Sequence, residues 1–555
     1  MTPPGTVAAN RKNVAMRRRS PIAWIDVGLV GALCAFGTAL RVPGLTSRNP
    51  WFDDAWAALP SRVGLHDALR MVVTTPLWTI GLRWWIQVLG YRTWWAQLPA
   101  LIFGIAGIAA VYALVRALRF SRLAAFLAAA VIAASPITVV YSTRIKEYSC
   151  DLVLACLVLW CLERWRRAPD GRALAALCAA GVVAIWTSAS TAAVVGGAAV
   201  AVCLVAWANR ERRRDAAGLL IVLALAVAAD WLLFLRHLPH QLRVNWRTHG
   251  FLFGYSSVRH VAFAFQQTFS GIAHGLAGLP IPYTFKGYSL RAVPMGLAIL
   301  TVAVLVCIVV PPLMAAVRSR GAATGPTVAA AATIVLATAG TLVGQSPLGD
   351  GRTDEALYPA LLVLCVSAAR WAAPRVVRRE ESRRFARAAL AGTVSVVAVI
   401  FGVRHVAQYP PTGLGPALAE VRAHMRPGDL IVIDGYESFA FGVTDQAPWR
   451  VSFAQGAVPW PMGFHVMSNV PTYVLSSNYL QPDASFAELS ARTHRLWFIW
   501  PSVGGYSTSA PSSLWALPFQ TPTLTGLQRL GWHGRLGPND VFTSPGTYAQ
   551  LFTHP

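Results

Sequence analysis

Long apolar stretches, separated by short polar segments, fill the first 405 residues of the chain. A helix that crosses a bilayer needs about 20 mostly apolar residues. The pattern therefore predicts a polytopic α-helical membrane protein with about eleven spans. We place them at residues 22–42, 96–117, 123–141, 147–162, 173–189, 191–208, 216–235, 293–316, 324–344, 356–373 and 388–405.

The pattern changes after about residue 405. Short apolar runs such as DLIVIDG, TYVLSS and RLWFIW predict strands, and the intervening AEVRAHM, FAELSAR and TGLQRLGW predict helices. This alternation is typical of a small α/β domain. We therefore expect a basic tail at 1–21, a transmembrane domain at 22–405 and an extracytoplasmic α/β domain at 406–555.

Residues 76–90, PLWTIGLRWWIQVLG, are an ambiguous apolar stretch. Counting them as a span would reverse every later loop and place the basic segments RALRFSR and RERRR outside. Tryptophans and amphipathic helices both favour the membrane–water interface. We therefore predict an amphipathic helix that lies at the outer surface.

Charge decides the orientation. Only 13% of the residues are charged, about half the roughly 25% of soluble domains, and the net charge is +24. Cytoplasmic loops of membrane proteins are rich in Lys and Arg. With the N-terminus inside, the inner segments hold 25 Lys and Arg, whereas the short outer segments 142–147 and 345–355 hold three. This asymmetry predicts a plasma-membrane protein with a cytoplasmic N-terminus, and it explains the charge without a nucleic-acid partner.

Two further features of the sequence argue against a cleaved signal peptide and against zinc or disulfide sites. The first 20 residues lack the apolar core of a signal peptide, so we expect them to remain as a cytoplasmic tail. The eight cysteines all lie in apolar stretches and form no CxxC pair. We therefore expect neither a structural zinc site nor a disulfide framework.

The unusual polar residues fall on the outer side in this topology. Ionisable groups beside a bilayer are costly, which makes them functional candidates. The first outer loop, NPWFDDAWAALP, carries two adjacent acids, and later outer segments add cations and further polar groups. The candidates are Asp53, Asp54, Arg144, Lys146, Glu147, Tyr148, His249, Gln345, Asp350, Arg352 and Tyr358.

Each candidate also has a purely structural explanation. Asp53 and Asp54 would cap the helix that follows them, and the outer cations would snorkel to the interface. The histidine-bearing segment is typical of a solvated surface. The combination is more specific: a carboxylate serves as a general base toward a hydroxyl, and Arg and Lys hold a phosphate. A carboxylate and phosphate-binding cations together at the outer interface favour a lipid phosphate donor.

Four stretches resemble one enzyme group. They are WFDDAWAAL, TPLWTIGLRWWIQVLGYRTWWAQLPALIFG, SPITVVYSTRIKEYSCD and GDGRTDEALYP. In this order they are similar to motifs of the GT-C superfamily of integral-membrane glycosyltransferases. That superfamily includes protein O-mannosyltransferases, lipid A aminoarabinose transferases and mycobacterial wall transferases. The likeness covers residues 22–405.

The resemblance implies an inverting hexosyl- or pentosyltransferase that uses a polyprenyl-phosphate sugar. Asp53 matches the catalytic acid, which deprotonates the acceptor hydroxyl, and Asp54 matches the second acidic position. Lys146 and Arg352 match cations that face the donor phosphate, and Arg144 would add a contact. The family often has Gln-Glu where this chain has Thr143-Arg144, so the sequence neither requires nor excludes a divalent cation. The acceptor would be an envelope glycan, lipid or protein.

The sequence leaves two other functions open. A transporter or flippase for a lipid-linked saccharide would show inverted repeats and charges within its spans. No inverted repeat is evident, and most spans carry no charged residue in their middle, with Asp230 near the outer end of the seventh span as the nearest exception. A catalytically silent envelope scaffold is the other alternative. A retaining mechanism needs two carboxylates on opposite sides of the sugar bond, about 5 Å apart. Adjacent acids do not readily flank a ring, so inversion is favoured.

Overall fold

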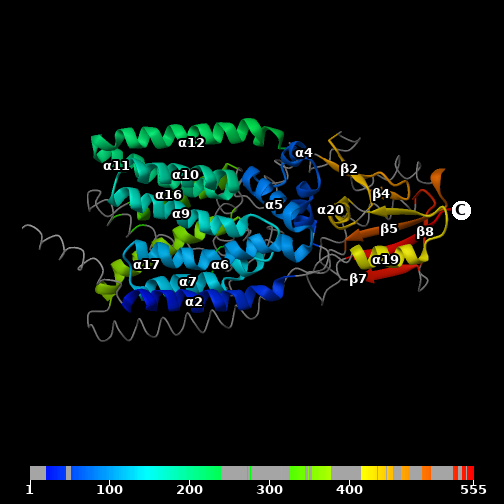
Figure 1. The fold of residues 1–555 in the computed structure, drawn as a ribbon, viewed down its shortest axis with the longest axis horizontal. Helices are drawn as coiled ribbons and strands as arrows, with labels where there is room; N and C mark the ends of the chain where they lie inside the picture. Colours follow the sequence, from blue (N-terminus) through cyan, green and yellow to red (C-terminus); the bar gives the residue numbers. More distant parts are fainter. Residues whose placement is uncertain are drawn as a thin grey trace, which may run out of the picture.

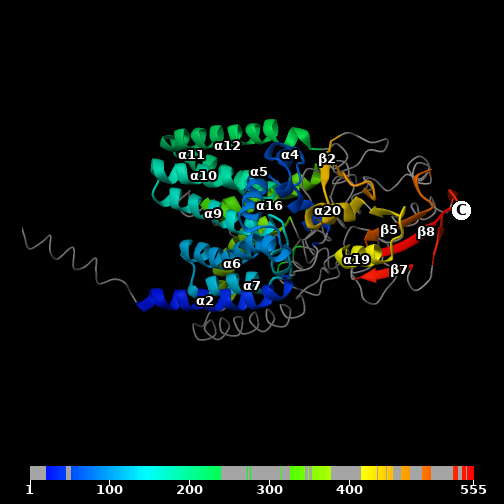
Figure 2. The same cartoon turned by 45° about the vertical axis from the view of Figure 1, so that its right-hand side comes forward.

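The computed structural model places a helical bundle at one end of an elongated molecule and an α/β domain at the other (Figures 1 and 2). The C-terminus lies at the far end of the α/β domain (Figure 1). The structure describes residues 21–45, 52–238, 325–343, 353–376, 414–433, 435–445, 447–453, 464–475, 491–501, 529–535, 540–544 and 547–555, together with a few isolated positions.

The bundle consists of long helices joined by short helical turns. Its long helices are α2 (Pro21–Arg41), α6 (Thr93–Ala117), α7 (Arg122–Ala134), α9 (Tyr148–Arg167), α10 (Gly171–Thr187), α11 (Ala192–Ala208), α12 (Arg213–Leu233), α16 (Gly325–Leu342) and α17 (Tyr358–Val376). The shorter elements are η1 (Val42–Gly44), α3 (Phe52–Ala58), η2 (Leu59–Arg62), α4 (Leu65–Arg70), α5 (Pro76–Leu89), α8 (Pro136–Tyr141), η3 (Ala189–Thr191), η4 (Arg210–Arg212), η5 (Leu235–His237) and η7 (Glu355–Leu357).

Most of the expected spans correspond to helices, but the expected number of eleven is not confirmed. Five segments of the described chain are long and apolar enough to cross a membrane, namely Trp24–Gly44, Thr93–Ala117, Ala189–Ala208, Arg210–His237 and Gly325–Leu342. Shorter apolar helices occur at Arg122–Ala134 and Gly171–Thr187. The spans expected at 293–316 and 388–405 lie outside the described residues.

The span expected at 123–141 is not one continuous helix. Helix α7 ends at Ala134, and α8 begins anew at Pro136. Proline lacks an N–H group and disfavours the helical conformation of the residue before it. Ser135 accordingly has an extended ψ of 123°. The apolar pattern continues through this break, which is why hydropathy alone does not reveal it.

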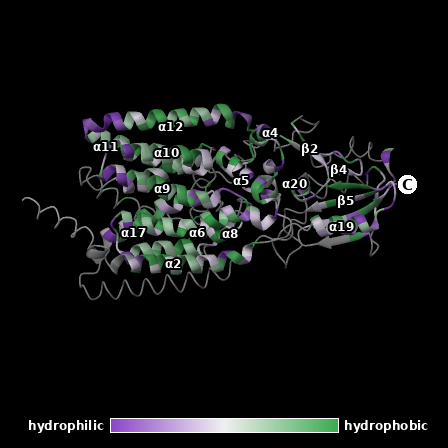
Figure 3. Cartoon of the chain, viewed as in Figure 1, coloured by the Kyte–Doolittle hydropathy of each residue, from purple (hydrophilic) through white to green (hydrophobic). Residues whose placement is uncertain are grey.

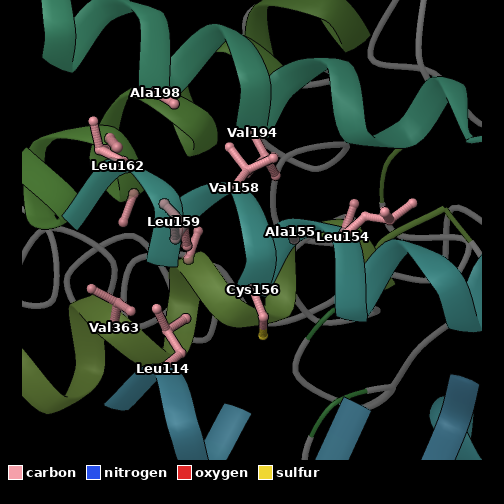
Figure 4. Packing of buried hydrophobic residues seen from close by; sticks show 14 of the residues in the cluster. Leu114, Leu154, Ala155, Cys156, Val158, Leu159, Leu162, Val194, Ala198 and Val363 are labelled. Carbon is pink, nitrogen blue, oxygen red and sulfur yellow. The ribbon is translucent and has the colours of Figure 1, made fainter. Parts of the chain in front are cut away.

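Helix α9 forms the centre of the bundle. Most of its side chains are buried, including those of Cys150, Cys156 and Cys161. Figure 4 shows α9 residues packed beside Leu114 of α6, Val194 of α11 and other apolar residues. The described cysteines are unpaired thiols, and the buried ones are small side chains that let neighbouring helices approach closely.

The ambiguous stretch at 76–90 forms the helix α5, at the end of the bundle next to the α/β domain (Figures 1 and 2). One face buries Trp78, Leu82 and Ile86, whereas Trp84 and Val88 are 63% and 61% exposed. This two-sided pattern agrees with an amphipathic interfacial helix.

The C-terminal domain is α/β, as the sequence predicts. Its central strands β1 and β4 pair in parallel, as do β1 and β5, and β8 runs antiparallel to β5, in the order β4-β1-β5-β8-β6. All four residues of β1 are buried, as expected for a strand covered on both faces. The elements are α19 (Leu414–His424), β1 (Leu430–Ile433), α20 (Gly435–Thr444), β2 (Trp449–Ser452), β3 (His465–Ser468), β4 (Tyr473–Leu475), β5 (Arg495–Pro501), β6 (His533–Gly534), β7 (Val541–Ser544) and β8 (Thr547–Thr553).

Hydrophilic residues gather at the end of the bundle farthest from the α/β domain (Figure 3). Helix α9 ends there in Arg164, Arg166 and Arg167, and α12 begins there at Arg213. The middle of the bundle is predominantly hydrophobic (Figure 3). The arginine-rich end of α9 and start of α12 thus lie at the opposite end of the apolar region from the α/β domain.

Helices α11 and α16 pack tightly against each other at Gly197. A Cβ atom there would lie 2.5 Å from the carbonyl oxygen of Ala329 and would also clash with the Thr333 hydroxyl. We expect Gly197→Ala to lower the thermal unfolding midpoint of the purified protein, because forced overpacking typically costs about 1–3 kcal/mol. Gly218→Ala in α12 is the control, since nothing lies within 4 Å of its Cβ position. Equal midpoints for the two variants would contradict this packing.

Candidate active site

The two adjacent aspartates occupy the first turn of α3. The helix dipole stabilises carboxylates at this position, so capping explains part of their placement. Asp54, however, also contacts a distant part of the chain. Its role therefore extends beyond its own helix.

Asp54 is tied to the loop that precedes α9. Its Oδ2 atom lies 3.1 Å from a terminal guanidinium nitrogen of Arg144. Its Oδ1 atom accepts a hydrogen bond of 2.9 Å from the backbone N–H of Ile145. The side chains of Asp54 and Arg144 are only 2% and 8% exposed. The structure therefore brings together two of the loops that the sequence identified separately.

The electrostatics of this pair are governed by burial. Burial raises the pKa of Asp54 above its ordinary value, and the Arg144 charge and the Ile145 N–H act in the opposite direction. The adjacent Asp53 raises the pKa further, although by less. A buried carboxylate remains charged only when it is paired and hydrogen-bonded, and Arg144 and Ile145 meet both needs.

Lys146 lies beside the same helix. Its ammonium nitrogen is 4.6 Å from the centre of the Trp56 ring, a cation–π contact. The side chain is buried, with 5% of the residue exposed. Within the described part of the chain, no carboxylate lies within ion-pair distance of this ammonium group. Lys146 therefore contributes a positive charge near the acidic pair that no described carboxylate neutralises at ion-pair distance.

The loop that carries these cations is held from several sides. Gln97 of α6 donates a 2.7 Å hydrogen bond to the carbonyl of Thr143. A Cβ atom at Gly44 would lie 2.8 Å from the Thr143 hydroxyl, so only glycine fits against the loop there. Ser142 accepts a 2.9 Å hydrogen bond from Nε of Arg41. The cations are thus presented by an ordered loop.

Arg41 is a buried residue that sequence reasoning missed. It lies at the end of α2, where an arginine is typically an interfacial anchor, yet it is fully buried. Its two terminal nitrogens donate to the carbonyls of Ile132 and Ala133, among other acceptors. The carbonyl of Ile132 would bond the N–H of residue 136 in an unbroken helix, and proline has none. Arg41 therefore satisfies backbone groups that the Pro136 break leaves open.

A buried acid also lies close to α9 and α17. Glu355 in η7 is fully buried, and neither of its carboxyl oxygens forms a hydrogen bond within the described residues. Burial, followed by the charge of Asp151 in α9, raises the pKa of Glu355 well above its usual range. Neither acid is among the candidates named from the sequence. Their burial, which depends on the packing of η7 against α9, makes them notable.

Some of the remaining candidate residues lie within the described part of the chain, and the others lie outside it. Tyr148 starts α9 and packs edge-to-face on Tyr141 with ring centres 5.1 Å apart. Glu147 directly precedes α9 and is half-buried, and Tyr358 is fully buried at the start of α17. The residues outside the described part of the chain are His249, Gln345, Asp350 and Arg352.

The described residues contain no group of three His, Cys, Asp or Glu side chains placed to hold a metal ion. The acid–cation cluster of Asp53, Asp54, Arg144 and Lys146 instead combines opposite charges at one end of the bundle. A carboxylate and an ammonium group in such proximity can accept a proton from a hydroxyl and stabilise a phosphate.

Known proteins share this architecture. Residues 75–234 match the family described as dolichyl-phosphate-mannose-protein mannosyltransferase. ArnT from Cupriavidus metallidurans in the apo state aligns with 96% of this chain and 98% of its own, at 14% identity and a TM-score of 0.50. The chain has a GT-C fold. Because it covers almost all of the chain, the alignment with ArnT also includes the α/β domain.

Two other solved structures show a weaker likeness to this chain. ArnT from C. metallidurans bound to undecaprenyl phosphate aligns with 96% of this chain and 98% of its own, at 15% identity and a TM-score of 0.48. The oligosaccharyltransferase of Archaeoglobus fulgidus in complex with Zn and sulfate covers 85% of this chain and 67% of its own, at 12% identity and a TM-score of 0.47. No curated protein sequence matches the chain.

The Asp54–Arg144 pair can be tested by unfolding experiments. We expect Arg144→Gln to destabilise the protein by about 3–5 kcal/mol, because it leaves a buried carboxylate unpaired. The double variant Asp54→Asn, Arg144→Gln should recover much of this loss. Thermal unfolding in detergent measures both. Arg535→Gln removes one partner of a surface pair that is 3.9 Å apart and should cost less than about 1 kcal/mol. A single Arg144 variant as stable as this control would contradict the assignment.

Proposed function

We propose that the chain is an inverting glycosyltransferase that moves a sugar from a polyprenyl-phosphate donor to a hydroxyl acceptor on an envelope glycan, lipid or protein. The observation that carries the proposal is the junction between α3 and the loop at 142–147, where acids and cations meet at one end of an apolar bundle. At such a junction the lipid tail remains in the bilayer while the phosphate reaches the cations.

The contacts of Asp54 indicate different roles for Asp54 and Asp53. One oxygen of Asp54 faces Arg144 and the other accepts from Ile145. Asp54 thus holds the loop in place, and we assign proton abstraction to Asp53, which is only half-buried. In the reaction, Asp53 takes the proton of the acceptor hydroxyl as its oxygen attacks the anomeric carbon. The bond from that carbon to the phosphate oxygen breaks, and polyprenyl phosphate leaves.

Lys146 is the best placed described cation for the leaving phosphate. Arg144 is already paired with Asp54, whereas the Trp56 ring contacts Lys146 without neutralising its charge. A fixed positive charge close to a developing phosphate anion lowers the barrier. Arg144 would then act mainly by orienting the loop, and Arg352 remains a second candidate for the phosphate.

The placement of the acids favours inversion. Asp53 and Asp54 are neighbours in one helical turn. Retaining enzymes need a nucleophile and an acid on opposite sides of the scissile bond. A single displacement requires only one base, which Asp53 supplies.

The segregation of charge supports an outward-facing site. The arginine-rich helix ends lie away from the α/β domain, and Lys and Arg mark the cytoplasmic side. In spheroplasts we expect Arg535→Cys in the α/β domain to react with a membrane-impermeant maleimide. Arg210→Cys, at the opposite end, should react only after permeabilisation. Both positions are exposed. The reverse labelling pattern would place the proposed site in the cytoplasm.

Asp53→Asn tests the base. In lipid nanodiscs supplied with a panel of radiolabelled polyprenyl-phosphate sugars, we expect transfer to fall about 100-fold or more, because a positioned general base contributes about 10²–10⁴ in rate. Binding of polyprenyl phosphate should change little. Asp67→Asn is the matched control, since Asp67 lies in α4 and is 47% exposed. Undiminished transfer by the Asp53 variant would remove the assigned base, and no transfer by the wild type from any donor would favour a transporter or a scaffold.

A further inference from the structure

A cleft of about 370 Å³ lies where the first outer loop meets the α/β domain. One wall comes from η2 and the residue after it, and the other comes from the first residue of β2 and the two residues before it. In both views, α4 and β2 lie next to each other at this junction (Figures 1 and 2). The lining residues are Ser61, Arg62, Val63, Ala447, Pro448 and Trp449.

The wall on the bundle side is ordered by Arg83 of α5. One nitrogen of its guanidinium group donates to the carbonyls of Pro60 and Ser61, at 3.0 and 3.4 Å, and also to that of Val63. The Ser61 hydroxyl donates to the carbonyl of Ala58 at 2.6 Å. These bonds fix the backbone of η2, so this side of the cleft is preformed.

The wall on the domain side is equally constrained. Trp449 pairs with Ser468 in the antiparallel β2–β3 hairpin, and the carbonyl of Pro448 accepts a 2.9 Å hydrogen bond from the N–H of Asn469. The N–H of Ala447 donates to Asp445 at 2.8 Å. A preformed site loses little conformational entropy when it binds a ligand.

Close packing holds the two walls together. A Cβ atom at Gly442 of α20 would lie 2.8 Å from Leu59 and 3.4 Å from the Trp449 ring. Nearby, the Arg70 guanidinium lies 4.2 Å from the centre of the Phe453 ring. The cleft is therefore bounded by an apolar interface between the first loop and the α/β domain.

The lining has the chemistry that a sugar chain requires. Arg62 is exposed and carries a fork of N–H donors. Trp449 is half-buried and combines an apolar face with a polar N–H. Sugar rings present apolar C–H faces and hydroxyl edges, so a ring stacked on Trp449 would offer its hydroxyls to Arg62. The walls are mixed and polar rather than a continuous apolar surface.

The distance to the proposed site matches an oligosaccharide rather than a single sugar. Arg62 follows Asp53 by nine residues, through the α-helix α3 and then the 3₁₀ turn η2, which corresponds to about 15 Å along the chain at about 1.5 and 2.0 Å per residue. One sugar whose hydroxyl reacts at Asp53 would not reach the cleft, whereas a short chain would.

We propose that this cleft binds the distal units of a saccharide acceptor, with Trp449 and Arg62 as its specificity-determining residues. The inference rests on the proposed function, because it names the acceptor class of the same site. It makes the α/β domain part of the acceptor site and predicts a preference for chains over single sugars.

The test is a binding measurement without donor. Linear oligosaccharides of graded length, released from the envelope polysaccharide of the host by partial acid hydrolysis, are titrated calorimetrically into the full chain in nanodiscs. We expect the longer oligosaccharides to bind and the monosaccharide to bind at least about tenfold more weakly. Arg62→Ala and Trp449→Ala should each raise the Kd of the longer chains about tenfold, equivalent to about 1.4 kcal/mol, because each removes the stacking face or the hydrogen-bond donors that the bound chain would use.

Arg450→Ala is the matched control. Arg450 is exposed and adjacent to Trp449 on β2, but successive strand side chains point to opposite faces. Its removal should leave the Kd within about twofold. Unchanged binding in the Arg62 variant, or no binding of any oligosaccharide by the wild type, would overturn the proposal. Since no donor is present, oligosaccharide binding by a protein that fails to transfer sugar would overturn the proposed function and leave the cleft assignment standing.

Discussion

A buried ion pair joins two loops on which the rest of the site depends. Asp54 faces Arg144, and the neighbouring N–H of Ile145 completes the carboxylate's hydrogen bonding. Lys146 is the next residue after Ile145, and it is therefore held against the ring of Trp56 in α3, the helix that also carries Asp54. Removing water from such a pair is costly unless each charge finds its partner. The ion pair thus fixes the two loops relative to each other, because moving either one would leave a buried charge unpaired.

Backbone polar groups that are buried within an apolar bundle also need hydrogen-bond partners. The Pro136 break leaves carbonyl groups open in a region where water is scarce, and unpaired backbone groups are costly there. Arg41 reaches from α2 to donate to the carbonyls of Ile132 and Ala133 and to the hydroxyl of Ser142. One side chain therefore satisfies the broken helix and also anchors the start of the loop that carries the cations.

The α/β domain is integrated with the membrane region rather than tethered to it. Residues of α3, η2 and α5 share one apolar core with α20 and the strands β1, β3 and β5. The helix with the acidic pair therefore lies between the bundle and the domain. This position explains how a domain distant in sequence would take part in acceptor binding while the donor lipid remains on the bundle side.

The sequence by itself determined the membrane class, most helix positions and the α/β character of the C-terminal part. These features depend on local patterns: 20-residue apolar runs, the excess of Lys and Arg in alternate loops, and the short apolar run LIVI that forms β1. It also named Asp54, Arg144 and Lys146 as candidates, because charges beside apolar runs are conspicuous.

Tertiary structure alone decided which of these candidates meet. That Asp54 pairs with Arg144, that Arg41 is buried, and that Glu355 lies near Asp151 all depend on how helices pack. Hydropathy records whether a residue prefers lipid or water, but it carries no information on which distant segment will lie beside it. The cleft at Arg62 and Trp449 exists only because two domains dock, and contacts between segments nearly 400 residues apart leave no local signal in one sequence.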